Sequence, residues 1–488
     1  MRKFVAATVL GTSIAGILSA CGGDGGYHGY GPPPPTLDSY LGTTGVFVAW
    51  ADDVSGTYSA ATVGSYAGKK QSLRGTIDFT TGQSLGQPAG VEIYKGGDGF
   101  IPLAGVYIDP NGNLFGTLSD YRSVNKHWNG IVYELQQRGA KWHQKTLHQF
   151  EPNKGDGANP TGALIPDGTG ALYGTTANGG SYGRKSGGGI VFKLTPPTNG
   201  VGDWTESILY SFNGRSEGTQ TGGGLIFDSK GSLYLTHDLA GTGLSGTVSM
   251  LSPPAQGATA WTDSTIYTFQ GGTDGGEPSG APLVFDASGA LYGVTQYGGG
   301  GTVCGTGYGC GTVYKLTPPA QGNGPWTETI LYTFTGGADG SEPNSNLVFD
   351  KNGNLYSTTY YGGAYSNGTV FELSPPTGGQ TTWTETVVHS LNGNVGDGFY
   401  PQGNTIMTSS GNLLVATTGG GTDDAGTIIQ LQPPAGNGSW SEEVLYSLPG
   451  ENGAQPIGIT LDTNGNIYGT TIYGGNRGGN GVAFEVNP

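Results

Sequence analysis

Residues 339–400, DGSEPNSNLVFDKNGNLYSTTYYGGAYSNGTVFELSPPTGGQTTWTETVVHSLNGNVGDGFY, are the clearest copy of a unit that recurs along the chain. An Asp-Gly-x-x-Pro motif leads into four apolar runs of strand length, which begin near Leu347, Leu355, Thr369 and Trp383. Gly, Pro, Asn and Asp separate these runs, and each of these residues favours a turn. Four short strands joined by turns predict one four-stranded antiparallel sheet.

The unit recurs at steps of roughly 54 to 64 residues, which is the size of a propeller blade. The second run of each copy opens with Leu114, Leu172, Leu233, Leu291, Leu355, Leu413 or Ile467. An aromatic residue follows in every copy except the one with Leu414. The third run follows Gly130, Gly189, Gly246, Gly311, Gly368, Gly426 or Gly481. The fourth run begins with Trp142, Trp204, Trp261, Trp326, Trp383 or Trp440, and this shared position predicts a packed structural role for tryptophan.

The last copy ends at Pro488 without a fourth run, so its sheet lacks an outer strand. The segment Val91–Tyr94 resembles the fourth run that starts at Ile330, and it precedes the first copy. An N-terminal strand that completes the last blade would remove an exposed sheet edge. The sequence therefore predicts an all-β fold, a seven-bladed β-propeller of four-stranded blades over residues 90–488, closed by an N-terminal strand.

Residues 37–89 are harder to interpret. Tyr58 precedes Phe115 by about one period, and residues 75–79 resemble the third run of the repeat, so a degenerate eighth blade is one interpretation. The block lacks the tryptophan and the Asp-Gly-x-x-Pro motif, which favours a small β appendage.

The N-terminus has the layout of a lipoprotein signal peptide, predicted over residues 1–20. Arg2 and Lys3 precede an apolar segment, and Leu18-Ser-Ala-Cys21 resembles a lipobox, in which Cys21 would be lipidated. Residues 21–36 are rich in Gly and Pro and predict a tether. Gly22 after the cysteine favours attachment to the outer membrane. The N-terminal lipid would be the protein's contact with that membrane. An ordinary cleaved signal is the alternative.

Composition limits the classes of partner. Only 11% of residues are charged and the net charge is -16, which argues against nucleic acid because phosphates require Lys/Arg stripes. The 96 glycines recur in register with the apolar runs and therefore indicate turns. We expect a monomer.

The core motif Gly-Asn-Leu-Tyr, followed by paired glycines and Gly-Thr-Val-Phe, resembles the GloVer tandem repeats of bacterial surface proteins with varied anchors. This resemblance covers about residues 90–488 and implies a surface β-propeller. The family has no established catalytic residues, so the resemblance implies no reaction.

One set of candidate ligand-binding residues is the carboxylates of the Asp-Gly-x-x-Pro linkers: Asp98, Asp156, Asp274, Asp339 and Asp397. On a propeller these linkers share a face with the loops between second and third strands, so a ring of carboxylates around the opening could bind calcium. The alternative is turn chemistry, in which Asp caps, Gly takes positive φ and Pro needs no donor. We favour the turn interpretation and expect no cofactor and no metal site. A second series in the hairpin turns (Asp109, Asp167, Asp228, Asp286, Asp350 and Asp462) is also interpreted as turn residues.

Tyrosines in the Gly-rich loops of the same face are the second set of candidates: Tyr297, Tyr361, Tyr365 and Tyr473, with Tyr182 and Tyr360 nearby in the repeat. Their rings could stack on sugars or peptides. Cys304 and Cys310 flank one such loop, and two thiols so placed in an exported protein predict a disulfide.

The sequence identifies no catalytic residues. His148 and His389 occupy a fourth-strand position that holds tyrosine in other copies, and only His127 and His237 lie near the predicted ligand face. We therefore expect a cell-envelope lipoprotein whose propeller binds or scaffolds a glycan, peptide or protein. A metal-dependent propeller lyase or hydrolase at the channel mouth is the alternative.

Overall fold

The computed structural model describes β-strands within residues 47–85 and most of residues 101–487. Outside the described residues lie 1–46, 86–100 and the short segments 52–57, 63–64, 67–68, 71, 79–83, 120–128, 140, 184–186, 215–216, 218–223, 242–244, 279–281, 301–303, 305–307, 321, 323, 395, 437, 451–452, 475–480 and 488. The chain divides into two units, Met1–Ser72 and Leu73–Pro488. The first contains two hairpins, β1 (Phe47–Ala51) with β2 (Tyr58–Thr62), and β3 (Ser65–Tyr66) with β4 (Lys69–Lys70).

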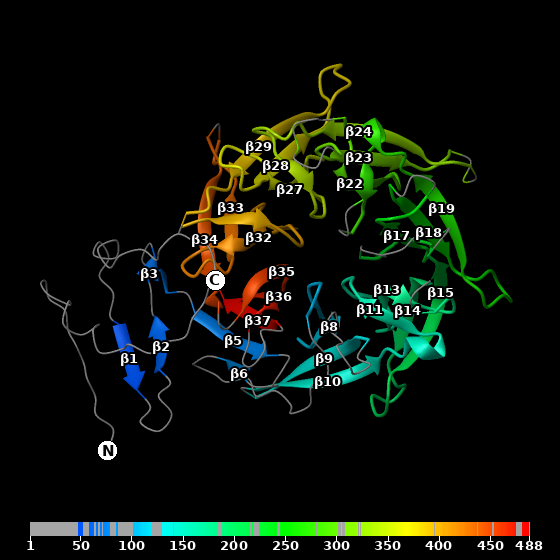
Figure 1. Cartoon of the computed structure of the whole chain (residues 1–488), viewed down its shortest axis with the longest axis horizontal. Coiled ribbons are helices and arrows are strands. Elements are labelled where there is room, and N and C mark those ends of the chain that lie inside the picture. The colour runs from blue at the N-terminus through cyan, green and yellow to red at the C-terminus, as the bar shows by residue number, and fades with distance from the viewer. Residues whose placement is uncertain are drawn as a thin grey trace, which may run out of the picture. The chain divides into compact units, whose positions relative to one another are not determined.

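The second unit is a seven-bladed β-propeller, as predicted (Figure 1). Blade 1 consists of β7 (Tyr107–Ile108), β8 (Leu114–Leu118), β9 (Ile131–Arg138) and β10 (Lys141–Gln149). Blade 2 consists of β11 (Gly157–Pro160), β12 (Ile165–Pro166), β13 (Leu172–Gly179), β14 (Gly187–Thr195) and β15 (Thr205–Asn213). Blade 3 consists of β16 (Ile226–Phe227), β17 (Leu233–His237), β18 (Thr247–Ser252) and β19 (Thr262–Thr268). Blade 4 consists of β20 (Gly276–Pro278), β21 (Val284–Phe285), β22 (Leu291–Tyr297), β23 (Thr312–Thr317) and β24 (Thr327–Thr333).

Blade 5 consists of β25 (Ser341–Pro343), β26 (Val348–Phe349), β27 (Leu355–Tyr361), β28 (Thr369–Ser374) and β29 (Thr384–Ser390). Blade 6 consists of β30 (Gly398–Pro401), β31 (Ile406–Met407), β32 (Leu413–Gly420), β33 (Thr427–Gln432) and β34 (Ser441–Ser447). Blade 7 consists of β35 (Ala454–Leu461), β36 (Ile467–Tyr473), β37 (Val482–Asn487), β5 (Ser72–Asp78) and β6 (Ser84–Leu85). In blades 2, 4, 5 and 6 the innermost strand is split into two short pieces, which both pair with the second strand. The described residues include no helix long and apolar enough to cross a membrane.

Aspartate closes the hairpin turn between the first two strands of a blade. Oδ1 of Asp350 accepts the backbone N–H groups of Asn352 and Asn354, each at 2.8 Å. The same pair of bonds occurs at Asp109, Asp167, Asp228, Asp286 and Asp462. This side-chain capping is what Asp supplies in tight turns, so the predicted turn role is confirmed.

Tryptophan at the start of a fourth strand packs on the aromatic residue of the preceding blade. Trp440 of blade 6 lies 5.7 Å from Tyr356 of blade 5, measured between ring centroids. Equivalent pairs are Phe115–Trp204, Tyr234–Trp326, Tyr292–Trp383 and Tyr468–Trp142. The exception in the sequence, Leu414, precedes blade 7, whose outer strand β5 contains no tryptophan. The predicted packing role of tryptophan is confirmed, and its contacts lie between blades.

The Asp-Gly-x-x-Pro proline of one blade sits against the glycine that precedes the third strand of the blade before it. A Cβ atom at Gly368 would lie 2.7 Å from Cδ of Pro401, and one at Gly426 would lie 2.6 Å from Cδ of Pro456. Gly130, Gly246 and Gly311 face Pro160, Pro278 and Pro343 in the same way. These glycines also have φ near +100°, which side chains rarely tolerate. The recurring glycine is therefore required by close approach as well as by conformation.

The ring closes between blades 7 and 1 by the same contacts. A Cβ at Gly481 would lie 2.6 Å from Cδ of Pro102, and Oγ1 of Thr470 donates to the Ala104 carbonyl at 2.8 Å. The predicted closure of the last blade by an N-terminal strand is confirmed, since β5 lies beside β37. The strand differs from the one expected, because β5 comes earlier in the chain than Val91–Tyr94, which lies outside the described residues. Pairing at a sheet edge uses main-chain groups, so similarity of side chains alone could not identify the strand.

Candidate functional site

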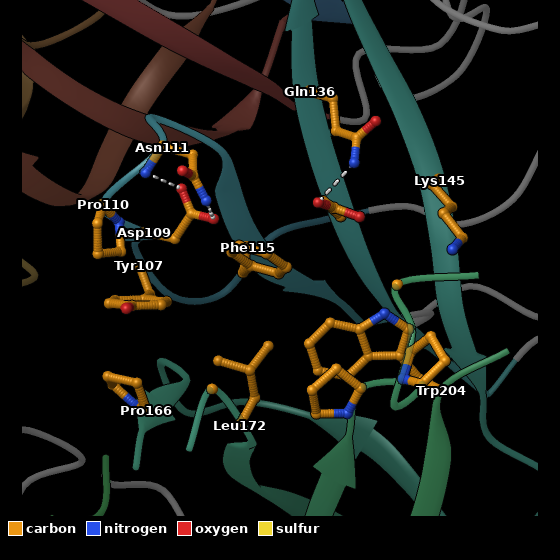
Figure 2. Close-up of a pocket in the computed structure, with 15 residues that line it drawn as sticks. Tyr107, Asp109, Pro110, Asn111, Phe115, Gln136, Lys145, Pro166, Leu172 and Trp204 are labelled. Carbon is orange, nitrogen blue, oxygen red and sulfur yellow. Dashed lines mark hydrogen bonds between the residues drawn. The ribbon is translucent and has the colours of Figure 1, made fainter. Parts of the chain in front are cut away.

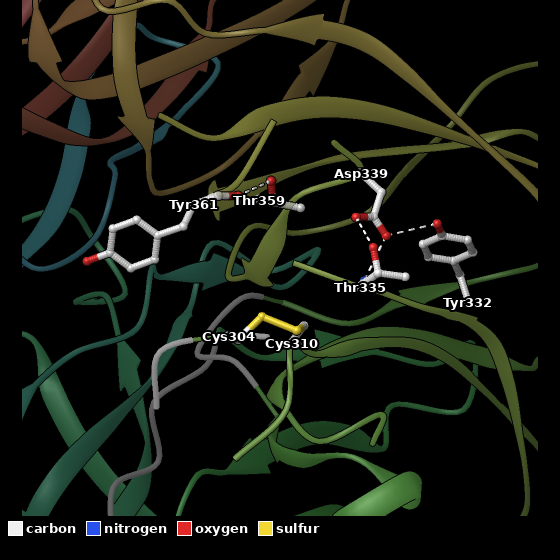
Figure 3. Close-up of a disulfide and its surroundings, with 7 residues drawn as sticks. All are labelled: Cys304, Cys310, Tyr332, Thr335, Asp339, Thr359 and Tyr361. Carbon is white, nitrogen blue, oxygen red and sulfur yellow. Dashed lines mark hydrogen bonds between the residues drawn. A yellow bond between two sulfur atoms is a disulfide. The ribbon is translucent and has the colours of Figure 1, made fainter. Parts of the chain in front are cut away.

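Each described linker aspartate bonds to the outer strand, or the turn after it, of the blade that the linker leaves. In Figure 3, Oδ2 of Asp339 accepts the backbone N–H of Thr335 at 2.7 Å and the hydroxyl of Tyr332 at 3.1 Å. Asp156, Asp274 and Asp397 make the corresponding bond to a backbone N–H at 2.6–2.9 Å. Asp98 lies outside the described residues. The four described aspartates thus make the turn contacts that the sequence predicted.

A second acidic residue, from the outer strand of the next blade, lies beside the linker carboxylate and its tyrosine or histidine partner. Tyr267 of blade 3 donates to Oδ1 of Asp274 and lies 2.8 Å from Oε2 of Glu328 on the outer strand of blade 4. The acid lies two residues after the fourth-strand tryptophan in five blades, at Glu206, Asp263, Glu328, Glu385 and Glu442, whereas Gln144 holds this position in blade 1. Five of the blade interfaces therefore bring two carboxyl groups together with one tyrosine or histidine.

At the interfaces that contain tyrosine, burial raises the pKa of the outer-strand glutamate. Burial, followed by the neighbouring Asp274, raises the pKa of Glu328 to about 8. Burial and Asp339 likewise raise the pKa of Glu385 to about 7. Two carboxylates this close cannot both ionise cheaply, so one proton is held at the interface.

Tyrosine and glutamate side chains of blades 4, 5 and 6 gather where the first and second strands reach the linker face. We call Tyr297, Tyr308, Glu342, Tyr361 and Tyr400 the tyrosine–glutamate surface. The rings of Tyr297 and Tyr308 are 6.2 Å apart, and those of Tyr361 and Tyr400 are 5.2 Å apart. The charge of Glu342 acts on one ring of each pair, since it contributes, after burial, to a raised pKa of Tyr297 and of Tyr361.

The centre of this surface is buried and its rim is exposed. Glu342 is 8% exposed, and Nε2 of Gln296 lies 3.4 Å from its Oε2. Tyr308 is 74% and Tyr361 is 39% exposed. Figure 3 shows Tyr361 projecting from the end of β27, away from Asp339 and the disulfide. The surface combines a buried carboxyl group with exposed tyrosine rings. This combination favours binding of a cation.

Two residues of this surface, Glu342 and Tyr400, have a strained backbone conformation. The residue before the linker proline has a left-handed φ of +52° to +59° in six blades, at Ile101, Asn159, Glu277, Glu342, Tyr400 and Gln455. The backbone N–H of Tyr400 donates to the Asn367 carbonyl of blade 5 at 2.8 Å, and that of Glu342 donates to the Cys310 carbonyl of blade 4 at 2.9 Å. Non-glycine residues in this conformation cost about 1–3 kcal/mol, so the contact between blades must hold them in place.

Of the other predicted tyrosines, Tyr360 and Tyr365 belong to blade 5, as Tyr361 does, and Tyr473 belongs to blade 7. Tyr365 is 60% exposed in the loop after β27, and Tyr473 is 43% exposed at the end of β36 in blade 7. Tyr360 stacks on Tyr400 with centroids 5.0 Å apart. The structure therefore brings Tyr297 and Tyr361 together and leaves Tyr473 in another blade.

Sequence reasoning missed Glu342, Tyr308 and Tyr400. A signal for two of them was present, because Glu342 and Tyr400 each occupy the position immediately before the proline of Asp-Gly-x-x-Pro. That position holds a different residue type in most blades, so it does not appear as a repeat feature.

The described histidines do not provide an exposed base on the linker face. His237 is completely buried, packs its ring 4.5 Å from Phe212, and has a pKa lowered by burial to about 4. His127 lies outside the described residues. His148 and His389 are on outer strands, at the tyrosine position, as predicted.

A cavity of about 430 Å³ lies between blades 1 and 2, beside the hairpin turns (Figure 2). Phe115, Leu172 and Trp204 form its apolar wall, and Asp109 and Lys145 lie at its edge. Asp109 bonds to its own turn and Phe115 contacts Trp204, so the wall consists of contacts that the fold already uses.

Cys304 and Cys310 form the predicted disulfide, with an S–S distance of 2.02 Å. Both residues are buried in the core cluster that contains Phe334 and Leu347. Tyr308 lies between the two cysteines in the chain.

Comparisons with known proteins identify one repeat family and several solved structures that are similar to this chain. Residues 58–301 and 181–404 match the family model of the Gloeobacter/Verrucomicrobia repeat. No curated protein matches the chain.

Among solved structures, a proposed 6-phosphogluconolactonase from Bacteroides uniformis is similar at 13% identity, with 73% of this chain and 88% of that chain covered and a TM-score of 0.46. A gluconolactonase from Xanthomonas campestris is similar at 12% identity, with 66% and 83% covered and a TM-score of 0.34. A protein of unknown function from Dyadobacter fermentans is similar at 12% identity, with 85% and 98% covered and a TM-score of 0.39. At these identities and TM-scores the similarities carry no information on the activity of this chain.

The raised pKa of Glu328 predicts a loss of stability with rising pH. When the pKa of a carboxyl group is higher in the folded state, proton binding by that group stabilises the folded chain. This contribution is fully present below the unfolded pKa and is lost as the pH rises toward about 8. We expect the melting temperature to fall between pH 5 and pH 8. Glu328→Gln, which is neutral at all pH values, should melt about 1–2 °C above the wild type at pH 8 and show a smaller fall.

Asp203→Asn is the matched control, because Asp203 is exposed in the loop before β15. It should leave the pH profile unchanged. Identical pH profiles for Glu328→Gln and the wild type would contradict a proton held at this interface.

Proposed function

The chain belongs to the Gloeobacter/Verrucomicrobia repeat family, and from this premise we propose that its propeller is a binding module for a cationic segment of a peptide or protein. The tyrosine–glutamate surface is the proposed binding site. The observation that carries this proposal is the presence of two contacting tyrosine pairs, Tyr297–Tyr308 and Tyr361–Tyr400, with the charge of Glu342 acting on one ring of each pair.

The chemistry of the surface favours a cation over a neutral sugar or an anion. Tyrosine faces attract ammonium and guanidinium groups, and the carboxylate at the base supplies a charge-assisted partner. Glu277, which also has a left-handed φ, adds a second carboxyl group beside Tyr297. The net charge of -16 would raise the rate at which a basic partner reaches the protein.

We further propose that the N-terminal segment attaches this module to the cell envelope. Leu18-Ser-Ala-Cys21 supports lipidation of Cys21, and the Gly- and Pro-rich residues 21–36 support a tether that separates the anchor from the folded units. These residues lie outside the described part of the chain, so the proposal depends on the sequence alone.

A lyase or hydrolase reaction has less support. The two groups of His, Asp and Glu found among the described residues include His148 and His389, which are on outer strands and not at the channel mouth. His237 is buried and therefore unavailable to a substrate in this conformation.

Binding can be tested with a heptalysine peptide and, separately, with a hexamer of N-acetylglucosamine, by calorimetry on the full chain. We expect heptalysine to bind and the sugar not to bind. Tyr361→Ala and Glu342→Gln should each weaken heptalysine binding about tenfold, the factor that ~1.4 kcal/mol corresponds to.

Tyr473→Ala is the matched control, since Tyr473 ends the second strand of blade 7 just as Tyr361 ends that of blade 5. It should leave the affinity unchanged. Equal effects of Tyr361→Ala and Tyr473→Ala, or binding of the sugar alone, would refute the proposed ligand class.

The anchor can be tested by Cys21→Ser. We expect the variant to leave the membrane fraction while its melting temperature stays that of the wild type, because the tether separates Cys21 from the folded units. Retention of Cys21→Ser in membranes after a carbonate wash would show that no lipid on this cysteine is needed.

A further inference from the structure

Two blade interfaces differ from the others in having histidine where tyrosine usually lies. His148 meets Asp156 and Glu206 between blades 1 and 2, and His389 meets Asp397 and Glu442 between blades 5 and 6. At the interfaces of Tyr210, Tyr267 and Tyr332 the phenol hydroxyl bonds to the linker carboxylate. Histidine at this position offers a ring nitrogen with a lone pair that a phenol does not provide.

The three ligand atoms of each histidine group lie within 4.8 Å of one another. Nε2 of His148 is 3.0 Å from Oδ2 of Asp156 and 3.5 Å from Oε1 of Glu206. Nε2 of His389 is 3.3 Å from Oδ2 of Asp397 and 3.6 Å from Oε2 of Glu442. Tetrahedral ligands about 2.1 Å from a zinc ion are about 3.4 Å apart. In each group the histidine nitrogen therefore lies at about this spacing from both carboxylates, and all three atoms stay within 4.8 Å of one another.

We propose that each of these two groups binds one divalent transition-metal ion, with Zn²⁺ as the representative. An imidazole nitrogen and two carboxylate oxygens form a donor set typical of such ions, whereas calcium prefers six to eight oxygens. Two carboxylates and a neutral histidine carry a charge that balances a divalent cation.

The surroundings hold the ligands in position. Asp156 is fixed by the backbone N–H of Glu151 at 2.9 Å and by that of Gly157, and Asp397 is fixed by Asn392 and Gly398 in the same way. The rings of His148 and Phe150 pack edge to face at 4.9 Å. Such outer contacts orient metal ligands and increase affinity.

The histidine is the feature that distinguishes these sites from the remaining interfaces. Glu206 and Glu442 each have a buried Oε1 without a hydrogen-bond partner, but so do Glu328 and Glu385 at tyrosine interfaces. The side chains of His148 and His389 are 19% and 20% exposed, so an ion and a completing water could reach them from outside.

The ion would join the outer strands of neighbouring blades. Its ligands come from β10 and β15 at one site and from β29 and β34 at the other, together with the linker aspartate. A ligand that binds only the folded chain stabilises it by mass action, so the site would strengthen the ring at two interfaces. This role is independent of ligand binding at the tyrosine–glutamate surface.

The test is zinc binding by the full chain at pH 7, followed by calorimetry and by thermal melting with zinc and with chelator. We expect His148→Tyr and His389→Tyr each to remove one bound zinc ion per chain, and the double variant to remove two. The wild type should melt higher with zinc than with chelator, and the double variant should lose this difference. Tyrosine is the chain's own residue at the equivalent positions, so these variants should fold.

Tyr332→His provides the reverse test, because it places the same three ligand types around Asp339 and Glu385. It should add one zinc ion per chain. If the double variant binds as many zinc ions as the wild type and keeps the same difference in melting temperature between zinc and chelator, the proposal is overturned. The histidines would then bind only a proton. A double variant that fails to fold would leave the single variants and Tyr332→His to decide, and no change in zinc stoichiometry in any of them would also overturn it.

Discussion

The contact between a proline that opens one blade and a glycine in the blade before it is the constraint on which the rest of the propeller depends. A methyl group at Gly368 would not fit between Pro401 of the next blade and the Thr359 carbonyl of its own blade, and Gly481 meets Pro102 and the Thr471 carbonyl in the same way where the ring closes. Proline is suited to this position because it has no N–H that would need a partner. The residue before it must then adopt a left-handed φ, and its N–H bonds to the previous blade. The strained residues Glu342 and Tyr400 are therefore direct consequences of the packing between blades.

Two further layers of contacts hold the blades together farther from the axis. Tryptophan on the outer strand packs on the second-strand aromatic residue of the previous blade, as in Tyr356 with Trp440. Beyond it, the acid two positions after the tryptophan reaches the linker aspartate of the previous blade, as Glu328 does at Asp274. The linker aspartates thus serve the interface between blades, whereas two residues of the tyrosine–glutamate surface, Glu342 and Tyr400, come immediately before linker prolines.

Much of the fold could be predicted from the sequence because its determinants recur as identical residue types. The glycine at the Gly368 position recurs in seven copies, the tryptophan at the Trp383 position in six, and the Asp339-Gly-x-x-Pro343 motif in five. The candidate site could be predicted only in part, since Tyr297 and Tyr361 belong to recognisable loops whereas Glu342 and Tyr400 occupy a position with no common residue type. The meeting of Glu206 with His148 depends on the twist of one sheet against the next, and spacing in the sequence does not encode it. The closing strand β5 was also missed, since main-chain pairing places few demands on side chains.

The central claim, that close approach between proline and glycine holds neighbouring blades, is tested most directly by the melting temperatures of Gly368→Ala and Gly353→Ala. Both glycines have positive φ, +97° and +86°, but a Cβ at Gly353 would meet nothing within 4 Å. Strain alone costs about 1 kcal/mol, so Gly353→Ala should lower the melting temperature slightly. Gly368→Ala should lower it several times more, and Pro401→Ala in the same chain should restore part of the loss, because the two residues are in contact. Equal losses for the two glycine variants, with no rescue by Pro401→Ala, would contradict the account.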